Sequence, residues 1–193
     1  MEKHRFSNEQ LREFVIAGHW NLPHVQAMLA EFPEMLNVPY KWGEDDWETA
    51  IQGAAHVGSS HVAEFLLAQG APLEICTAAM LGRQADVERL LDEDPNLVNA
   101  QGAHGISLMA HVALSGNVSL AQILFERGAK DEDMSLALGN AVGKGHTAMA
   151  RWLLENYTPD LAWKNYEGKN SLTVATERGD HAMVDLLRGF GAS

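Results

Sequence analysis

Residues 168–192 read GKNSLTVATERGDHAMVDLLRGFGA, and residues 47–71 read WETAIQGAAHVGSSHVAEFLLAQGA. Both stretches carry a residue in a Thr-like position, a Leu or Ile two residues later, small residues, a glycine, and an apolar segment ending in Gly-Ala. The same order recurs over 105–129, and more loosely over 73–91 and 136–154, while a diverged first copy follows Asn8. Recurrence of this kind indicates a repeat architecture.

One glycine in each copy sets the register of the repeats. These glycines are Gly18, Gly58, Gly82, Gly116, Gly145 and Gly179. They are separated by 40, 24, 34, 29 and 34 residues, with a mean of about 32, close to the ankyrin period of about 33. Each glycine is expected to end a first helix of small residues and to precede a second helix with bulkier apolar residues. Such a pair is too short to bury its apolar face alone, so stacking is expected.

The chain resembles the ankyrin-repeat family over roughly residues 8–192. The family motif is G-x-T-P-L-H-x-A-A-x-x-G, and its best match is the segment from Gly168 to Gly179, in which Asn170, Ser171 and Thr173 replace Thr, Pro and His. No copy keeps the full T-P-L-H tetrapeptide. The resemblance implies an all-α solenoid of about six stacked helix-turn-helix units, in a single domain spanning 1–193. The expected repeats are about 8–39, 40–72, 73–100, 101–131, 132–164 and 165–193.

The resemblance also implies β-hairpin fingers between the repeats, and their lengths are predicted to be unequal. The first finger, 38–47, is longer than usual, and full-length fingers are expected near 99–106 and 163–170. The short interval between Gly58 and Gly82 leaves almost no finger between Gly70 and Leu73. We therefore expect gaps in the concave side of the stack.

Ankyrin proteins usually bind partners with their finger tips and the exposed ends of their first helices. The candidate partner-binding residues at matching positions are Tyr40, Trp42, Asp45, Asp46, Trp47, His56, Met80, Leu81, His104, Leu114 and Tyr166. Two questions stay open. Met80 and Leu81 are either an adaptable apolar surface or are covered by the shortened loop. The tryptophans of the first finger either anchor a partner or pack back on the first repeat.

The composition limits the classes of partner. Lys and Arg total 14 and Asp and Glu total 26, which gives a formal charge of −12. This balance disfavours nucleic acid and anionic membrane surfaces and favours a protein with a basic surface. The N-terminus lacks the apolar run of a signal peptide, and no stretch has the length of a membrane span, so a cytoplasmic location is expected.

The sequence offers little catalytic chemistry. It contains no phosphate-binding loop, no nucleophile elbow and no HExxH,. The lone cysteine, Cys76, is expected to be a buried small hydrophobe. Among nine histidines, His19 and His146 follow turn glycines, where a structural role is expected. Of the remaining His56, His104 and His111, only His104 and His111 could meet, and two imidazoles without a third ligand make a weak zinc site. We therefore expect no catalytic residue, no metal and no cofactor.

These observations favour a protein–protein interaction module that catalyses no reaction, with the partner on the concave finger and first-helix surface. The alternative is a sensor or carrier of a small ligand, held in the gap left by the shortened finger before the third repeat. The apolar C-terminal residues Leu186, Leu187 and Phe190 suggest a cap that leaves the protein a monomer or a weak homodimer.

Overall fold

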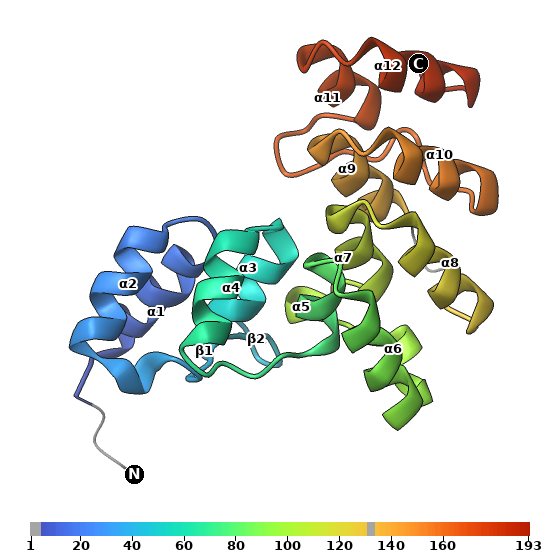
Figure 1. The fold of residues 1–193 in the computed structure, drawn as a ribbon. Helices are drawn as coiled ribbons and strands as arrows, with labels where there is room; N and C mark the ends of the chain where they lie inside the picture. The colour runs from blue at the N-terminus through green and yellow to red at the C-terminus, as the bar shows by residue number, and fades with distance from the viewer. Residues whose placement is uncertain (1–4, 131–133) are drawn as a thin grey trace.

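The computed structural model describes residues 5–130 and 134–193, and the regular secondary structure of this part of the chain is almost entirely helical. It contains twelve α-helices, short 3₁₀ turns and one two-stranded sheet (Figure 1). The helices are α1 (Asn8–Gly18), α2 (Leu22–Glu31), α3 (Ala50–Val57), α4 (Ser60–Ala68), α5 (Ile75–Met80), α6 (Gln84–Glu93), α7 (Leu108–Ser115), α8 (Val118–Glu126), α9 (Ser135–Lys144), α10 (Thr147–Asn156), α11 (Ser171–Glu177) and α12 (His181–Gly189). The all-α prediction is therefore confirmed.

The odd-numbered helices contact one another in chain order: α1 packs on α3, α3 on α5, α5 on α7, α7 on α9 and α9 on α11. Each also packs against the helix that follows it, and α2–α4, α8–α10 and α10–α12 form a second set of contacts. The described helices thus form a row of pairs, which bends at α5 (Figure 1). The expected boundary between repeats at 131/132 lies outside the described residues.

Glycines with left-handed backbone conformation end five of the six first helices. Gly58, Gly82, Gly116, Gly145 and Gly179 have φ between 67° and 76°, a region that side chains with a Cβ disfavour. Gly18 differs, because α1 runs through it and the cap residue is His19. A Cβ on Gly18 would lie 2.5 Å from the carbonyl oxygen of Ala50. Gly18 is therefore required for the close approach of α1 and α3, and the expectation that it forms a left-handed turn is wrong.

The buried apolar side chains form two clusters that divide near α5. One runs from Leu11 to Met80 and includes Leu114, and the other runs from Ile75 to Leu187. The connection before α5 is short and α5 itself has six residues, so α7 also contacts α3 directly. On the same side, Nζ of Lys144 donates to the carbonyl oxygen of Gly58 at 3.1 Å. This hydrogen bond ties α9 back to the second helix pair across the bend.

The connections differ in length: hairpins lie at the two expected places near 38–47 and 99–106, but the full-length hairpin expected near 163–170 is absent. We call residues 40–48 the first hairpin; its strands β1 (Tyr40–Lys41) and β2 (Trp47–Glu48) pair antiparallel. We call residues 101–107 the second hairpin; it is closed by a bridge between Gln101 and Ser107. Residues 163–170 form a hydrogen-bonded turn without strands, and 71–74 have no regular structure.

The expected gap beside the first hairpin is partly closed, because the second hairpin contacts β2 and α3. At the C-terminus, Leu186 and Leu187 are buried within the chain, and Phe190 is the exposed member of the predicted cap surface. None of the helices in the described ranges has the length and apolar character needed to cross a bilayer.

Candidate functional site

A fully buried carboxylate lies where the first hairpin meets α3. Glu48 is the last residue of β2 and has no solvent exposure. Thr49 follows it and forms a capping box with Gln52 at the start of α3, which fixes the backbone beside Glu48,. The indole Nε1 of Trp42 donates to Oε2 of Glu48 at 2.8 Å, and Nε2 of His56 lies 2.9 Å from Oε1. A buried carboxylate requires such partners, because desolvation of an unpaired charge is costly.

His19 approaches the same carboxylate from the turn between α1 and α2. Its Nδ1 lies 3.0 Å from the carbonyl oxygen of Val15 and 3.2 Å from that of Ile16, so Nδ1 carries the proton in the neutral ring,. Its Nε2 then faces Oε1 of Glu48 at 3.5 Å. The absence of a side chain at Gly53 makes room for this ring, because a Cβ there would lie 2.9 Å from Cε1 of His19.

His104 reaches the group from the second hairpin, 56 residues further along the chain than Glu48. Its Nε2 lies 3.4 Å from Oε1 of Glu48, and its Nδ1 lies 2.8 Å from a carboxylate oxygen of Asp46. His104 has a φ of 58°, the one positive value among the described residues other than glycine. Backbone strain at a polar contact of this kind is frequent at functional sites. We call His19, Glu48, His56 and His104 the Glu48 cluster.

The electrostatics of the cluster favour an ionised Glu48 carboxylate and lower the pKa of one of the imidazoles, that of His19. Burial alone would raise the pKa of Glu48, but the hydrogen bond from His56, the charges of both neighbouring histidines and the Trp42 hydrogen bond together lower it,. Burial is the largest influence on His19 and lowers its pKa, although the charge of Glu48 opposes this shift. Glu48 is therefore an anionic acceptor at neutral pH.

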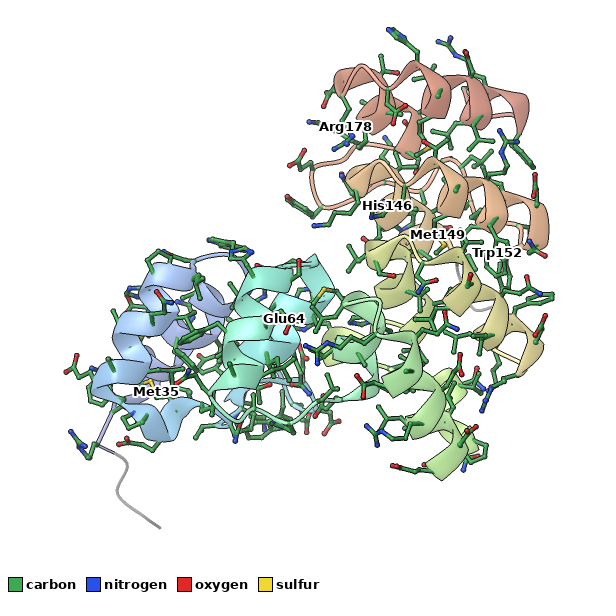
Figure 2. All side chains as sticks on the ribbon, viewed as in Figure 1. Met35, Glu64, His146, Met149, Trp152 and Arg178 are labelled. Carbon is green, nitrogen blue, oxygen red and sulfur yellow. The ribbon has the colours of Figure 1, made fainter. Side chains whose placement is uncertain are left out.

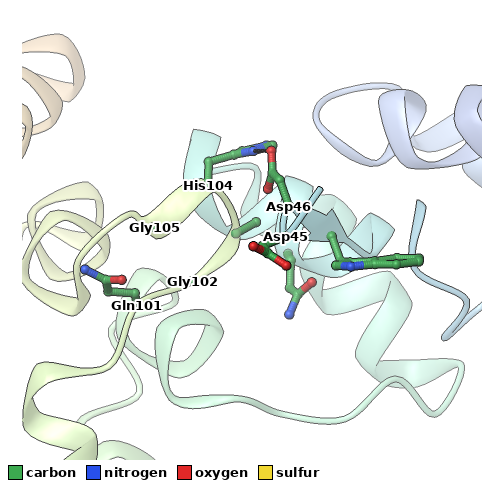
Figure 3. Close-up of a pocket in the computed structure, with 9 residues that line it drawn as sticks. Asp45, Asp46, Gln101, Gly102, His104 and Gly105 are labelled. Carbon is green, nitrogen blue, oxygen red and sulfur yellow. Dashed lines mark hydrogen bonds and ion pairs between the residues drawn. The ribbon is translucent and has the colours of Figure 1, made fainter. Parts of the chain in front are cut away.

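An open depression of about 670 Å³ lies beside the cluster, between the two hairpins (Figure 3). It is lined by Asp45, Asp46, Trp47, Gln52, Gln101, Gly102, Ala103, His104 and Gly105. In the sequence these residues flank the connection at 71–74 that lacks a hairpin. Figure 3 shows His104 reaching across to Asp46 along one edge, with Gln101 on the opposite side.

The predicted binding residues divide into exposed and buried groups. Trp47 is 50% exposed and Tyr166 is 96% exposed. Met80 and Leu114 are buried against the N-terminal cluster, because the short connection brings α5 and α7 onto α3. Their placement on a partner-binding surface is therefore wrong, while Leu81 stays half-buried. Of the two residues, Met80 belongs to the core and Leu81 packs partly buried against it.

The two tryptophans of the first hairpin differ: one packs back on the first helix pair and the other stays exposed. Trp42 packs back on the molecule: its ring lies edge-on to Tyr40 at 4.7 Å and beneath the Arg12 guanidinium, and its indole binds Glu48. Trp47 remains half exposed, with Nζ of Lys41 5.1 Å above its ring centroid. Of the two, only Trp47 is available to a partner.

His104 and His111 have different partners, so the pairing that the sequence allowed is not the one formed. His111 is buried, and its Nδ1 donates to the carbonyl oxygen of Ser107 at 2.9 Å. The ring of His104 instead lies 5.2 Å from that of His56. The sequence signal was the unequal repeat spacing. Because the connection at 71–74 before the third helix pair carries no hairpin, the second hairpin reaches the second helix pair. Cys76 is buried as expected, and burial raises the pKa of its thiol to about 12.

No protein-family model and no curated protein matches this sequence. Its function is therefore inferred from the geometry of the fold and of this site.

Proposed function

We propose that the chain is an ankyrin-type solenoid that acts as a protein-binding module, without catalytic activity, and that it holds a partner over the depression between the two hairpins. The observation that carries this proposal is the half-exposed Trp47 on the rim of a depression whose two walls are fastened together by the contact between His104 and Asp46. A rigid aromatic side chain beside a preformed depression is a favourable anchor, because little conformational entropy is lost when a partner binds.

The charge of this surface indicates the chemistry of the partner. Asp45 and Asp46 both line the depression, in a chain with a formal charge of −12. Acidic groups at the rim accelerate encounter with a basic partner and disfavour acidic ones. We therefore propose a protein segment rich in Lys or Arg, contacting Trp47 and Asp45. Tyr166, nearly fully exposed on the turn at 163–170, offers a second aromatic contact further along the row.

A small ligand is the second candidate, because the depression occupies the region where the short connection was expected to leave a gap. Its volume lies within the range of about 300–1,000 Å³ typical of ligand sites. Such sites are usually enclosed and apolar, whereas this depression is open and lined by polar side chains and glycines. The protein segment is therefore the better-supported occupant.

Binding of labelled basic peptides tests the proposal. Fluorescence anisotropy with Lys/Arg-rich peptides and with acidic peptides of equal length measures the preference directly. A Trp47→Ala/Asp45→Lys variant is expected to weaken basic-peptide binding by at least about tenfold, the usual effect of losing an interface anchor.

Phe190→Ala is the matched control, since it removes an exposed aromatic ring from the opposite end of the chain. It is expected to leave peptide affinity unchanged. Equal affinity of wild type for basic and acidic peptides, or full binding by the double variant, would show that this surface is not the binding site. A thermal-shift screen of metabolites tests the second candidate, which requires a saturable rise in Tm that Trp47→Ala reduces.

A further inference from the structure

Donor atoms of the Glu48 cluster converge on a common space. The Nε2 atoms of His19 and His56 are 3.1 Å apart, and they lie 3.5 Å and 2.9 Å from Oε1 of Glu48. A tetrahedral zinc ion with bonds of about 2.0–2.1 Å to nitrogen and oxygen holds its ligand atoms about 3.3 Å apart. The three observed separations bracket this value.

His19 and His104 also have the protonation and support that a metal site needs, whereas His56, which donates to Glu48 in this structure, would release its Nε2 proton on binding the ion,. The Nδ1 proton of His19 is directed at two backbone carbonyl oxygens, which leaves a lone pair on Nε2 facing the cluster. The Nδ1 of His104 is held by the Asp46 carboxylate, which leaves its Nε2 directed at Glu48 in the same way. Trp42 holds the other oxygen of Glu48. Carbonyl and carboxylate partners behind a histidine, and hydrogen bonds behind a carboxylate, are the usual second layer of a metal site.

We propose that His19, Glu48 and His56 form a binding site for a divalent transition-metal ion, with Zn²⁺ as the ion they fit best. These three residues come from the α1–α2 turn, from β2 and from α3, and their donor atoms all lie within 4.8 Å of one another. Nε2 of His104 also lies 3.4 Å from the same carboxylate oxygen, on the side where the second hairpin contacts β2.

The donor types select the class of ion. Two imidazole nitrogens and one carboxylate oxygen suit zinc and its neighbours, whereas Ca²⁺ and Mg²⁺ require mainly oxygen donors in larger numbers. Two histidines and one glutamate are also a recurrent three-ligand zinc set that leaves a fourth position for another group. Here His104 lies outside the three converging donors, which leaves that position for water or an exogenous group,.

Metal binding here would join segments that are distant in the sequence. The ligands span residues 19–56, and His104 adds the second hairpin. The ion would hold the first hairpin against the first two helix pairs and fix the wall of the depression that carries Asp46. Because the unfolded chain does not bring these donors together, binding stabilises the folded state.

The test uses the full chain, treated with a chelator, dialysed and titrated with Zn²⁺ against a chromophoric competitor. One ion per chain is expected, with a saturable rise in Tm, and Co²⁺ is expected to give the visible absorption of a low-coordinate site. His56→Ala is expected to weaken Zn²⁺ binding by at least about 100-fold, since partners behind a ligand are already worth about 10–100-fold. His104→Gly, which also relieves the positive φ, is expected to weaken binding by a smaller factor.

The control is His61→Ala/His181→Ala, which removes two exposed histidines from other parts of the chain and is expected to bind like wild type. If His56→Ala fails to fold by circular dichroism, Glu48→Gln takes its place, because it keeps an acceptor for Trp42 and removes the charge. The proposal is overturned if wild type binds no stoichiometric Zn²⁺, or if folded His56→Ala or Glu48→Gln binds as tightly as the control variant. A positive result is independent of peptide binding, which is measured separately.

Discussion

His19 and His146 occupy the same place in the sequence pattern, directly after the glycine that sets the register of each repeat, yet they make different contacts. Nε2 of His146 donates to the carbonyl oxygen of Leu114, 32 residues earlier, at 3.1 Å. The ring thereby fastens one helix pair to the preceding pair, near the turn where Figure 2 labels it. His19 instead donates to carbonyl oxygens of its own helix and turns its second nitrogen toward Glu48.

The difference shows that the facing element, and not the local motif, decides what each histidine does. His146 meets a backbone carbonyl at the end of α7, and Gly116 gives it space, because a Cβ there would lie 2.7 Å from the ring. His19 meets a hairpin that carries a buried carboxylate. One junction is a neutral hydrogen bond and the other is a charged cluster, so substitutions should affect them unequally.

The largest expected effect comes from removing the carboxylate. In the presence of chelator, Glu48→Ala is expected to lower the free energy of unfolding by about 3 kcal/mol, because the Trp42 indole and His56 lose a buried charged partner. His146→Ala removes one neutral hydrogen bond and is expected to cost about 1–2 kcal/mol. Urea unfolding followed by circular dichroism measures both.

Glu48→Gln is the control for this comparison, because the amide keeps an acceptor oxygen at nearly constant volume. It should fall between wild type and Glu48→Ala. A cost for His146→Ala equal to that for Glu48→Ala would show that the charged cluster is no more important to the fold than an ordinary turn contact.

Much of the fold was accessible from the sequence, because repeated small-residue helices and turn glycines report local backbone requirements. The helical class and the positions of the long and missing hairpins follow from this spacing. The site was less accessible. Glu48 precedes a Thr at the end of the first hairpin and belongs to no recognisable sequence motif. Its contact with His104 depends on how far the second hairpin extends across the short connection at 71–74. Met80 was misplaced for the same reason, since its burial follows from the bend at α5.

A third histidine sharpens the comparison, because His111 is buried without a carboxylate partner. Burial, with a smaller contribution from the charge of His56, outweighs the Ser107 hydrogen bond and lowers the pKa of His111 to about 4, from 6.5 in the unfolded chain. Above pH 6.5 His111 is neutral in both the folded and the unfolded chain, and the stability of the fold is at its full value. Between pH 6.5 and 4 the unfolded chain takes up a proton that the folded chain does not, so the free energy of unfolding falls with the pH,. The loss is expected to be about 1 kcal/mol per pH unit.

Urea midpoints of wild type and His111→Leu between pH 4.5 and 7.5 measure this effect. Other titrating groups are common to both proteins, so the difference between the two curves isolates His111. The wild type should lose stability more steeply with acid than the variant. Parallel curves would show that His111 accepts a proton in the fold at little cost.

The smallest expected effect concerns two glycines inside helices, Gly53 in α3 and Gly143 in α9. Replacing a helical glycine by alanine usually stabilises a protein by up to about 1 kcal/mol, because the unfolded chain loses freedom. A Cβ on Gly143 would meet no atom within 4 Å, whereas a Cβ on Gly53 would lie 2.9 Å from the His19 ring and 3.4 Å from the Glu48 carboxylate. Gly143→Ala should therefore raise the urea midpoint, and Gly53→Ala should lower it or leave it unchanged. Stabilisation by both substitutions would mean that the His19 ring moves aside at no cost, and the placement of His19 against Glu48 would then not be a tight constraint of the fold.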